Sequence, residues 1–291
     1  MGNNVLGKIA GMTSQAFSLD GPDCQHCPST TPNRRQLLWG VSAFGVFGFS
    51  TRSLANDVMA TTISDLVASN HILSSQGVLD SYGHVSARSP VRSDRFLLSR
   101  SLAPGSVTSE DILEFDLDGT VIGGTANRLY LERFIHSAIY RARPDVMAIV
   151  HSHSPTSIAF SISKVPLRAV THFGAFIGDR AAVFEADPDG KNPTLLIANN
   201  ALGARLAAAL GDQQMILIRG HGDVIVGPGV SIATTRALNA AKNAKVLLDG
   251  YRLSGEITSL TKDEDNALTK LETSDQEQRE WTTLKKSVGG R

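Results

Sequence analysis

Cysteine is almost absent from this chain. Of 291 residues only Cys24 and Cys27 are cysteines, and both lie close to the N-terminus. The rest of the chain therefore has no disulfide framework. A structural zinc site needs four ligands, and no second cysteine pair is present to complete one with this pair.

The chain also lacks an excess of charge of either sign. Lysine and arginine total 28, aspartate and glutamate total 28, and the formal net charge is +0. General binding to nucleic acid or to a membrane surface usually goes with a basic excess, so we expect neither partner. The hydrophobic content of 42% suits a globular protein of one or two domains.

The apolar run near the N-terminus, Leu37 to Phe49, is too short to span a bilayer comfortably, because a spanning helix needs about 20 residues. Arg34-Arg35 stands just before the run, and the small-x-small triplet Ser53-Leu54-Ala55 follows it. This order resembles a twin-arginine export signal. We expect a leader over residues 1–55 and a periplasmic location. The alternatives are a membrane anchor and a cytoplasmic enzyme with a mispredicted start.

The chain beyond the leader alternates between helix and strand patterns, with no internal repeat and no linker. Periodicity predicts helices over residues 57–73, 129–143, 155–160, 201–211 and 230–253. Strand patterns cover residues 81–90, 95–100, 145–153, two strands within 109–124 and two within 214–228. This interleaving predicts one domain, residues 56–257, with a mixed sheet covered by helices. Residues 258–291 are predicted to form a charged helical tail, either solvated or in contact with a partner.

Two histidines end the buried strand "DVMAIVHSH". His151 and His153 are two residues apart, so in an extended strand their side chains point to the same side. Two imidazoles side by side repel each other when protonated, and a divalent cation bound to both neutral rings removes that conflict. Taken alone, the pair fits either a metal site or two polar residues at a strand end.

Two further residues favour the metal site. His221 stands between two glycines after another predicted strand, and open catalytic metal sites commonly use three protein ligands. Glu132 lies beside the apolar face of the helix predicted over 129–143. By itself it would be interpreted as a solvated surface residue, but with the histidines it becomes a candidate acid/base group.

The segments "GHVSAR", "YLERFIHSAIYRARPDVMAIVHSHSP" and "ILIRGHGDVIVGP", in this order, resemble the class II aldolase/adducin superfamily over roughly Ile63 to Gly255. The resemblance implies a three-layer α/β/α sandwich with a central mixed, largely antiparallel sheet, commonly in a homotetramer. It also implies that His151, His153 and His221 bind a divalent metal, usually zinc, with manganese, iron or cobalt as alternatives. Glu132 would be the catalytic acid/base.

The resemblance also suggests substrate-binding positions, and here the sequence departs from the sugar-phosphate aldolases of the family. His84 replaces an asparagine in the first phosphate-binding turn, which also holds Ser86, and Arg100 follows Ser99 where a compact turn is expected. An arginine suits a carboxylate at least as well as a phosphate. His172 could line the substrate pocket, or it could be an ordinary loop residue.

These features predict a metal-dependent carbon–carbon lyase, an aldolase or a decarboxylase, acting on a small hydroxylated and carboxylated substrate. "LYLERFIH" is similar to a branch of the family with aromatic-acid decarboxylases. Two alternatives stay open: a sugar-phosphate aldolase or epimerase, and a non-enzymatic binding module of the adducin type.

Overall fold

A computed structural model of the chain describes residues 51–124, 128–271 and 275–289. Most of the predicted leader, including Arg34-Arg35 and both cysteines, lies outside the described residues, so its predictions stay predictions. Among the residues that are described, no helix combines the length and the apolar character needed to cross a membrane.

The described strands form one seven-stranded sheet in the order β3-β2-β1-β4-β7-β6-β5. Its members are β1 (His84–Arg88), β2 (Arg95–Ser99), β3 (Ile112–Asp116), β4 (Ala148–Ser152), β5 (Ala182–Phe184), β6 (Met215–Ile218) and β7 (Gly222–Gly227). Strands β5 and β6 run parallel, and every other neighbouring pair is antiparallel. The mixed, largely antiparallel sheet expected from the sequence is confirmed.

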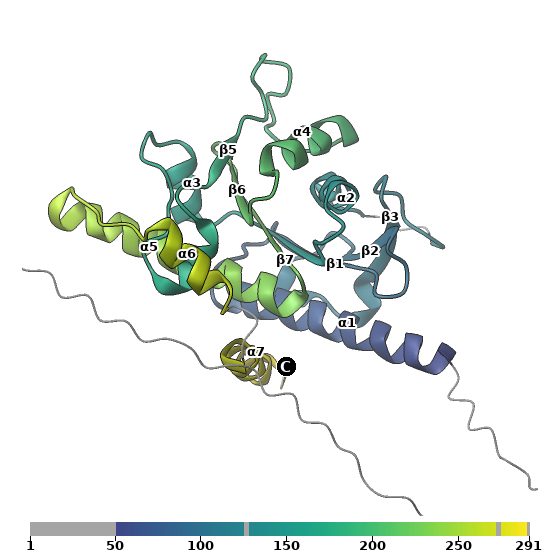
Figure 1. Ribbon diagram of the computed structural model, residues 1–291. Coiled ribbons are helices and arrows are strands. Elements are labelled where there is room, and N and C mark those ends of the chain that lie inside the picture. Colours follow the sequence, from purple (N-terminus) through teal and green to yellow (C-terminus); the bar gives the residue numbers. More distant parts are fainter. Residues whose placement is uncertain (1–50, 125–127, 272–274, 290–291) are drawn as a thin grey trace, which may run out of the picture. The chain divides into compact units, whose positions relative to one another are not determined.

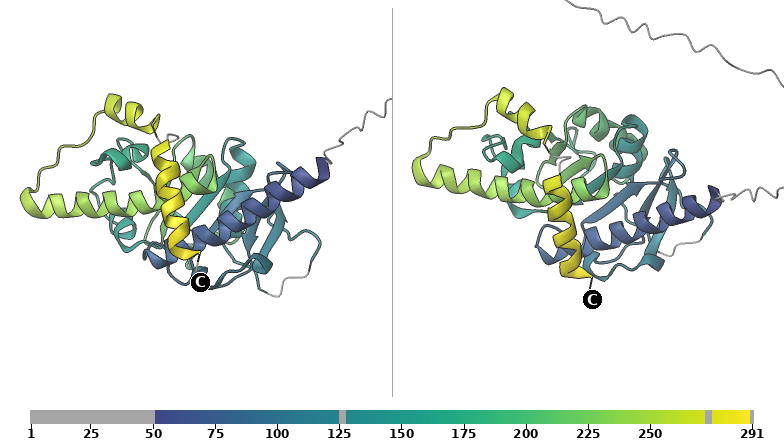
Figure 2. Two further views of the ribbon diagram at one scale, coloured as in Figure 1. Left: turned by 90° about the horizontal axis from the view of Figure 1, so that it is seen from below. Right: turned by 60° about the horizontal axis from the view of Figure 1, so that its bottom comes forward.

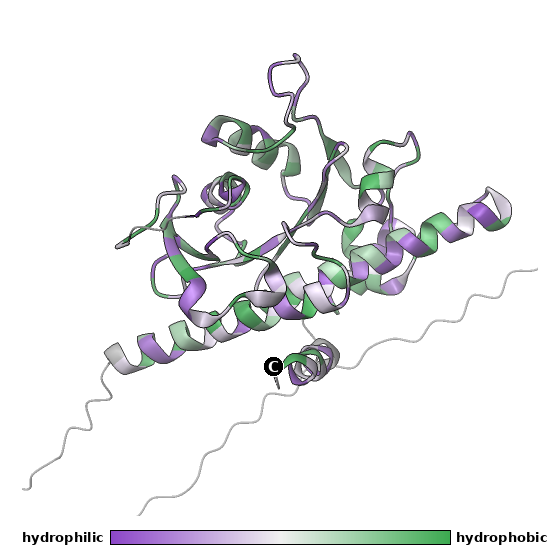
Figure 3. Ribbon diagram, turned by 180° about the vertical axis from the view of Figure 1, so that it is seen from behind, coloured by the Kyte–Doolittle hydropathy of each residue, from purple (hydrophilic) through white to green (hydrophobic). Residues whose placement is uncertain are grey.

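Helices cover both faces of this sheet, which makes three layers (Figure 1). They are α1 (Thr51–Ser75), α2 (Arg133–Ala142), α3 (Pro155–Ser161), α4 (Asn200–Leu210), α5 (Val230–Ser254), α6 (Lys262–Thr269) and α7 (Asp275–Val288), with short 3-10 turns η1 (Pro104–Ser106), η2 (Ser109–Asp111) and η3 (His172–Ile177). Helices α2 and α4 pack on one face, and α1, α3, α5 and α7 supply the core of the other. Both α1 and α5 carry hydrophobic and hydrophilic residues along their length, as expected between a sheet and solvent (Figure 3).

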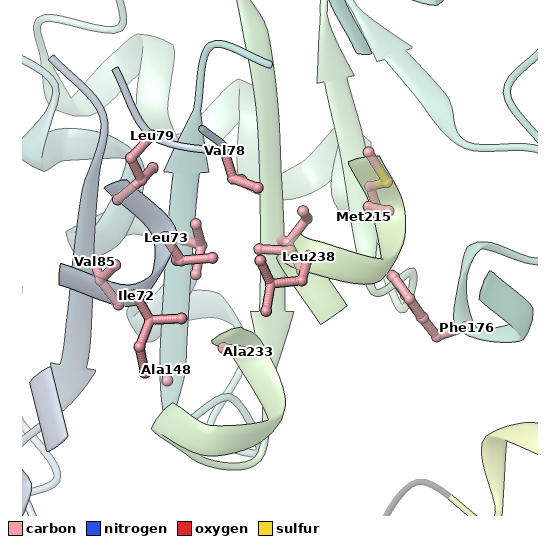
Figure 4. Packing of buried hydrophobic residues seen from close by; sticks show 14 of the residues in the cluster. Ile72, Leu73, Val78, Leu79, Val85, Ala148, Phe176, Met215, Ala233 and Leu238 are labelled. Atoms are coloured by element: carbon pink, nitrogen blue, oxygen red, sulfur yellow. The ribbon is translucent and has the colours of Figure 1, made fainter. Parts of the chain in front are cut away.

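Strand β4 shows how the two cores arise from period-two alternation. All five of its residues are buried. Ala148 and Val150 join the core under α1 and α5, part of which Figure 4 shows, while Ile149 faces the core under α2 and α4. His151 continues the second series, so its side chain lies on the α2 face of the sheet.

Helix α2 begins later than periodicity predicts. It starts at Arg133, with Glu132 at the N-cap, and Leu131 is 61% exposed instead of facing the core. The reason lies in the tertiary structure: Tyr130 packs on the ring of His84 and donates a hydrogen bond to the carbonyl of Leu102. These contacts hold the chain out of the helical path, so the predicted start at residue 129 is wrong.

The two strands predicted within residues 109–124 form only in part, around a turn at Asp118-Gly119. The turn is present, with Gly119 at a φ of +78°. The second strand, however, is reduced to a single bridge between Phe115 and Val121. The return segment therefore adds no full strand to the sheet edge at β3.

The charged tail divides into two helices, α6 and α7. Thr261 begins α6 with a capping box to Glu264. In α7, Trp281 is 7% exposed and Val288 is 5% exposed, and both belong to the core cluster that α1 and α5 supply. Figure 2 shows α7 crossing these helices. The tail helix is thus part of the domain's packing and not simply solvated.

Candidate metal centre

His151 and His153 lie at the end of β4. His151 is fully buried in the strand, and His153 follows the last strand residue, Ser152. Their ring centroids are 4.9 Å apart, in an edge-on arrangement. The strand pattern therefore places the two side chains together, as predicted.

His221 reaches the same point from the turn between β6 and β7. Gly220 adopts a φ of +64°, which a glycine tolerates, and this reverses the chain directly before the histidine. Gly222 lies so close to β4 that an added Cβ atom would overlap the carbonyl oxygen of Ser152. The two glycines thus allow His221 to lie beside His151, with ring centroids 5.1 Å apart.

Glu132 completes the cluster from the N-cap position of α2. Its Oε1 atom accepts a hydrogen bond of 2.9 Å from the Ile197 backbone N–H. Its Oε2 atom lies 3.3 Å from His151 Nε2 and 3.2 Å from His221 Nε2. The side chain is 9% exposed, so it is a buried carboxylate aimed at the histidines.

Each histidine is held through its Nδ1 atom. His151 Nδ1 lies 2.9 Å from the Asp223 carbonyl, and His221 Nδ1 lies 3.3 Å from the Leu195 carbonyl. His153 Nδ1 lies 3.0 and 3.1 Å from the two carboxylate oxygens of Asp80. Because all these partners accept hydrogen bonds, each Nδ1 carries the hydrogen and each neutral ring offers the Nε2 lone pair.

The Nε2 atoms converge at separations that fit a metal ion. His153 Nε2 lies 3.2 Å from His151 Nε2 and 3.1 Å from His221 Nε2. A tetrahedral ion with bonds of about 2.0–2.1 Å holds its ligand atoms about 3.3 Å apart. Lone pairs this close repel unless a cation or a proton lies between them. One ligand atom from each histidine and one from Glu132 all lie within 4.8 Å of one another.

The charges of these groups are strongly coupled. Burial raises the pKa of Glu132, but hydrogen bonds from His151 and His221 outweigh it and hold the pKa far below its ordinary value. Burial lowers the pKa of His151, yet the bond and the charge of Glu132 raise it overall. Burial and the neighbouring His151 lower the pKa of His153. Glu132 and His151 thus each favour the charged form of the other.

Three supporting residues had not been predicted. Asp80 accepts hydrogen bonds from the backbone N–H groups of Tyr82 and Gly83. Such a turn is local, because an aspartate side chain commonly bonds to the backbone two residues further on. Its pairing with His153, 73 residues away, has no signal in the sequence. Leu195 and Ile197 act through their backbones, and Leu195 adopts a φ of +59°, a costly conformation for leucine that is concentrated at functional sites.

The structure places the predicted substrate residue His84 beside the candidate metal ligands. His84 pairs with His151 across β1 and β4, with ring centroids 5.3 Å apart, and is 1% exposed. Ser86 lies one step deeper and is fully buried, and its hydroxyl contacts His136 Nδ1 at 2.6 Å and Tyr140 OH at 2.8 Å. His136 is a core residue with a hydrogen-bond partner at each ring nitrogen.

Ser99 and Arg100 lie at the same end of the sheet as His84, because β2 runs antiparallel beside β1 and ends where β1 begins. Ser99 is buried at the last position of β2. Arg100 follows it, and its Nε donates a hydrogen bond of 2.7 Å to Asp111 Oδ1 while the side chain stays 45% exposed.

His172 lies in a different part of the structure from the cluster. It begins η3 and lines a cavity of about 630 Å³ bordered by η3, α5, α6 and α7. No residue of the metal cluster lines this cavity. Asn243 of α5 accepts hydrogen bonds from the backbone of Val170 and Thr171, which anchors η3 against α5. The structure therefore does not bring His172 next to the cluster, and its predicted role in substrate binding stays a prediction.

Known proteins share this architecture. The chain is 36% identical over 205 residues to a decarboxylase, tropJ, of Talaromyces stipitatus, covering 66% of this chain and 77% of that protein. It is 29% identical over 205 residues to a 3,4-dihydroxyphthalate decarboxylase of Arthrobacter keyseri, covering 65% and 78% of the two chains. The structure resembles an L-fuculose 1-phosphate aldolase of Glaciozyma antarctica, with a TM-score of 0.65, 26% identity and coverage of 80% and 90%.

The family comparison agrees with these similarities. Residues 64–248 match the model of the class II aldolase and adducin N-terminal domain. The matched range contains Glu132 and all three converging histidines. The chain belongs to the class II aldolase and adducin family.

Proposed function

We propose that this chain is a divalent-metal-dependent carbon–carbon lyase that acts on a small hydroxylated and carboxylated substrate. The observation that carries the proposal is the convergence of three neutral imidazole Nε2 atoms and one buried carboxylate at separations a metal ion fits. The similarity to two decarboxylases supports the choice of a lyase.

The residues of the cluster would have separate roles. His151, His153 and His221 would hold the metal, with Glu132 as a fourth ligand in the absence of substrate. When bound, a divalent ion supplies Lewis acidity that stabilises the negative charge left on substrate oxygens when a carbon–carbon bond breaks. Glu132 Oε2 takes up or returns the proton, and the Ile197 N–H holds the other carboxylate oxygen in place.

The ligand set favours zinc among the candidate metals. Three imidazole nitrogens and a carboxylate oxygen are common zinc ligands, and catalytic zinc sites use three protein ligands beside an open position. Manganese, iron and cobalt also accept imidazole and carboxylate, and they remain alternatives.

Arg100 supports a carboxylated substrate. Asp111 holds one edge of the guanidinium through Nε. Arg100 follows the last residue of β2, at the end of the sheet where β1 begins with His84. A planar fork of this kind suits a carboxylate through two parallel charge-assisted bonds. His84 stands at the asparagine position of the first phosphate-binding turn of the family's sugar-phosphate enzymes. The bulky Arg100 stands in the second segment, where a compact turn is expected.

A second function, a sugar-phosphate aldolase, is favoured by the similarity to the L-fuculose 1-phosphate aldolase. A screen separates the two. Purified protein is supplied with zinc and offered carboxylated catechols or ketose 1-phosphates, while carbon dioxide and aldehyde are measured. Carbon dioxide from the catechols supports the proposal; aldehyde from the sugar phosphates alone replaces it with the second function, and no product from either class rejects both.

The variant Arg100→Ala tests whether Arg100 binds the carboxylate of the substrate. Removing a charged hydrogen bond should weaken kcat/KM for carboxylated substrates by the equivalent of about 1.5–3 kcal/mol. Arg92→Ala is the matched control, because Arg92 is exposed and, among the described residues, its side chain forms an ion pair with Asp94 alone. Equal activity of the two variants would show that Arg100 does not bind the carboxylate.

We also propose export to the periplasm and assembly into a homotetramer. Replacing Arg34 and Arg35 with lysine should abolish periplasmic delivery, and unchanged fractionation would favour the cytoplasmic alternative. The mass of the purified protein, measured by light scattering, tests the tetramer.

A further inference from the structure

We propose that His84 donates a hydrogen bond from its Nε2 atom to an oxygen of the bound substrate, and that a buried relay ending at Tyr140 holds the ring in this donor form. The inference rests on the proposed lyase function and assigns one more contact in the same site.

The position of His84 allows its side chain to contact a substrate bound at the proposed metal centre. It lies directly opposite His151 in the β1–β4 register, so both side chains are on the α2 face of the sheet. Its ring lies 5.3 Å from that of His151 and 4.3 Å from that of Tyr130, measured between centroids. These neighbours leave the ring little freedom to rotate.

A chain of short hydrogen bonds runs from His84 into the core. His84 Nδ1 lies 2.8 Å from His136 Nε2, and His136 Nδ1 lies 2.6 Å from Ser86 Oγ. Ser86 Oγ lies 2.8 Å from the hydroxyl oxygen of Tyr140. All four residues are at most 1% exposed, so water does not compete for these bonds.

Only one arrangement of hydrogens satisfies every neutral member of this relay. Among the described residues, the Tyr140 hydroxyl has Ser86 as its one partner, so it donates to Ser86 Oγ. The Ser86 hydroxyl must then donate to His136 Nδ1, because otherwise its hydrogen would be buried without an acceptor, at a cost of about 1–3 kcal/mol.

The same donor-to-acceptor direction continues through the imidazole rings of His136 and His84. Since His136 accepts at Nδ1, its hydrogen is on Nε2, which donates to His84 Nδ1. His84 therefore carries its own hydrogen on Nε2, an atom that has no hydrogen-bond partner in the described part of the chain. An N–H group in this position needs an acceptor, and a substrate oxygen beside the metal ligands supplies one.

This assignment gives His84 a role in specificity. A neutral N–H donor binds a carboxylate, phenolate or carbonyl oxygen and leaves a substrate N–H or ammonium at that point unpaired. Because a polar site rejects a group that leaves its own hydrogens unsatisfied, His84 selects for an acceptor oxygen.

The tautomer is read directly by NMR. In zinc-loaded protein with 15N-labelled histidine, long-range proton–nitrogen correlation distinguishes a protonated Nε2 from a protonated Nδ1, and comparison with His84→Gln assigns the His84 signals. We expect His84 to be protonated at Nε2, and its Nε2–H resonance to shift when 2,3-dihydroxybenzoate binds. A hydrogen on Nδ1, or binding without a shift, overturns the proposal.

The relay is tested with two serine variants. Ser86→Ala removes the link between Tyr140 and His136, so the single His84 tautomer should give way to a mixture. Ser69→Ala is the matched control, since Ser69 is equally buried and bonds to Thr234 on the opposite side of the sheet. A His84 tautomer that is unchanged in Ser86→Ala contradicts the relay.

Kinetics test the contact itself. His84→Gln keeps an N–H donor, whereas His84→Leu has none. We expect kcat/KM of His84→Leu to be at least about tenfold below that of His84→Gln at equal metal content, and equal values would overturn the donor role. If no substrate is turned over, the proposed function fails alone, because the tautomer is measured without turnover.

Discussion

The hydrogen-bond partners of the three Nδ1 atoms leave the Nε2 atoms free to bind a metal ion in the proposed centre. Two partners are backbone carbonyls, which the fold fixes, and the third is the carboxylate of Asp80. A carboxylate behind an imidazole orients the ring and raises its basicity toward a metal. Asp80 is therefore a positioning residue of the proposed centre, although it is not one of the four candidate ligands.

Asp80→Asn should weaken metal binding about 10–100-fold, the range found when such outer partners are lost. Asparagine keeps an oxygen for the His153 N–H but removes the negative charge. Competition with a chromophoric chelator measures the affinity. Asp94→Asn is the control, because Asp94 is exposed and its ion-pair partner within the described part of the chain is Arg92. Equal affinities for the two variants would show that the Asp80 charge has no effect on the metal.

His136 makes folding stability depend on pH. Burial, with a further contribution from the nearby His151, lowers the pKa of His136 to about 3. In the unfolded chain histidine binds a proton below about pH 6.5, so the unfolded state holds more protons than the folded state between these values. Stability is therefore lost as pH falls through this window, by up to about 1.4 kcal/mol per pH unit for this one group.

Denaturant unfolding of chelator-treated protein at several pH values between 4 and 7 shows whether the free energy of unfolding decreases as the pH falls. His136→Gln, which removes one titrating group, should lower the slope of stability against pH by about 1.4 kcal/mol per pH unit. A slope equal to that of the unchanged protein would mean that His136 is not held neutral.

The sequence predicted the cluster residues because strand ends and glycines mark them locally. His151 and His153 follow an apolar run, and His221 stands between two glycines. The supporting atoms could not be predicted, since Asp80 and Leu195 meet their histidines across 73 and 26 residues. Such contacts depend on strand register and loop paths, which no local pattern encodes.

At the scale of elements, the close approach of β7 to β4 positions His221. Gly222→Ala would drive a Cβ atom into the Ser152 carbonyl, which is rigid strand backbone. We expect a loss of about 1–3 kcal/mol in the free energy of unfolding, as for overpacked interiors, together with weaker metal binding.

Gly124→Ala is the matched control for this substitution, because no atom of the described residues beyond its chain neighbours lies within 4 Å of a Cβ atom at that position. Thermal unfolding and metal titration of both variants give the comparison. If Gly222→Ala matched Gly124→Ala in both measurements, the tight strand contact would not be needed to place His221.

Element types were predicted better than element starts. Helix α4 runs from Asn200 to Leu210 with Gly211 as its C-cap, and α5 runs from Val230 to Ser254. Both are close to their predicted bounds, because periodicity and end signals are local. The start of α2 was wrong because the contacts of Tyr130 with His84 and Leu102 override helix propensity. The error matters for function, since it moves Glu132 from a helix face to an N-cap aimed at the histidines.

At the scale of the whole described domain, α7 closes the layer formed by α1 and α5. Trp281 is buried in that layer, and Lys285 pairs with Asp65 of α1 at 2.6 Å. Trp281→Ala should lower the free energy of unfolding by about 3–5 kcal/mol, the usual cost of deleting a buried aromatic side chain. Leu253→Ala, at a position 88% exposed, is the control for chemical denaturation; similar midpoints would mean that α7 contributes little to the domain.

Elemental analysis of the purified protein tests the metal centre most directly. We predict about one divalent ion per chain, consistent with a single site of three imidazoles and a carboxylate, in the unchanged protein. The same content is expected in His71→Ala, whose histidine bonds to the Val107 carbonyl. His151→Ala should lose the ion and the lyase activity. An unchanged protein without a divalent ion, or a His151→Ala variant that retains both the ion and the activity, would contradict the account.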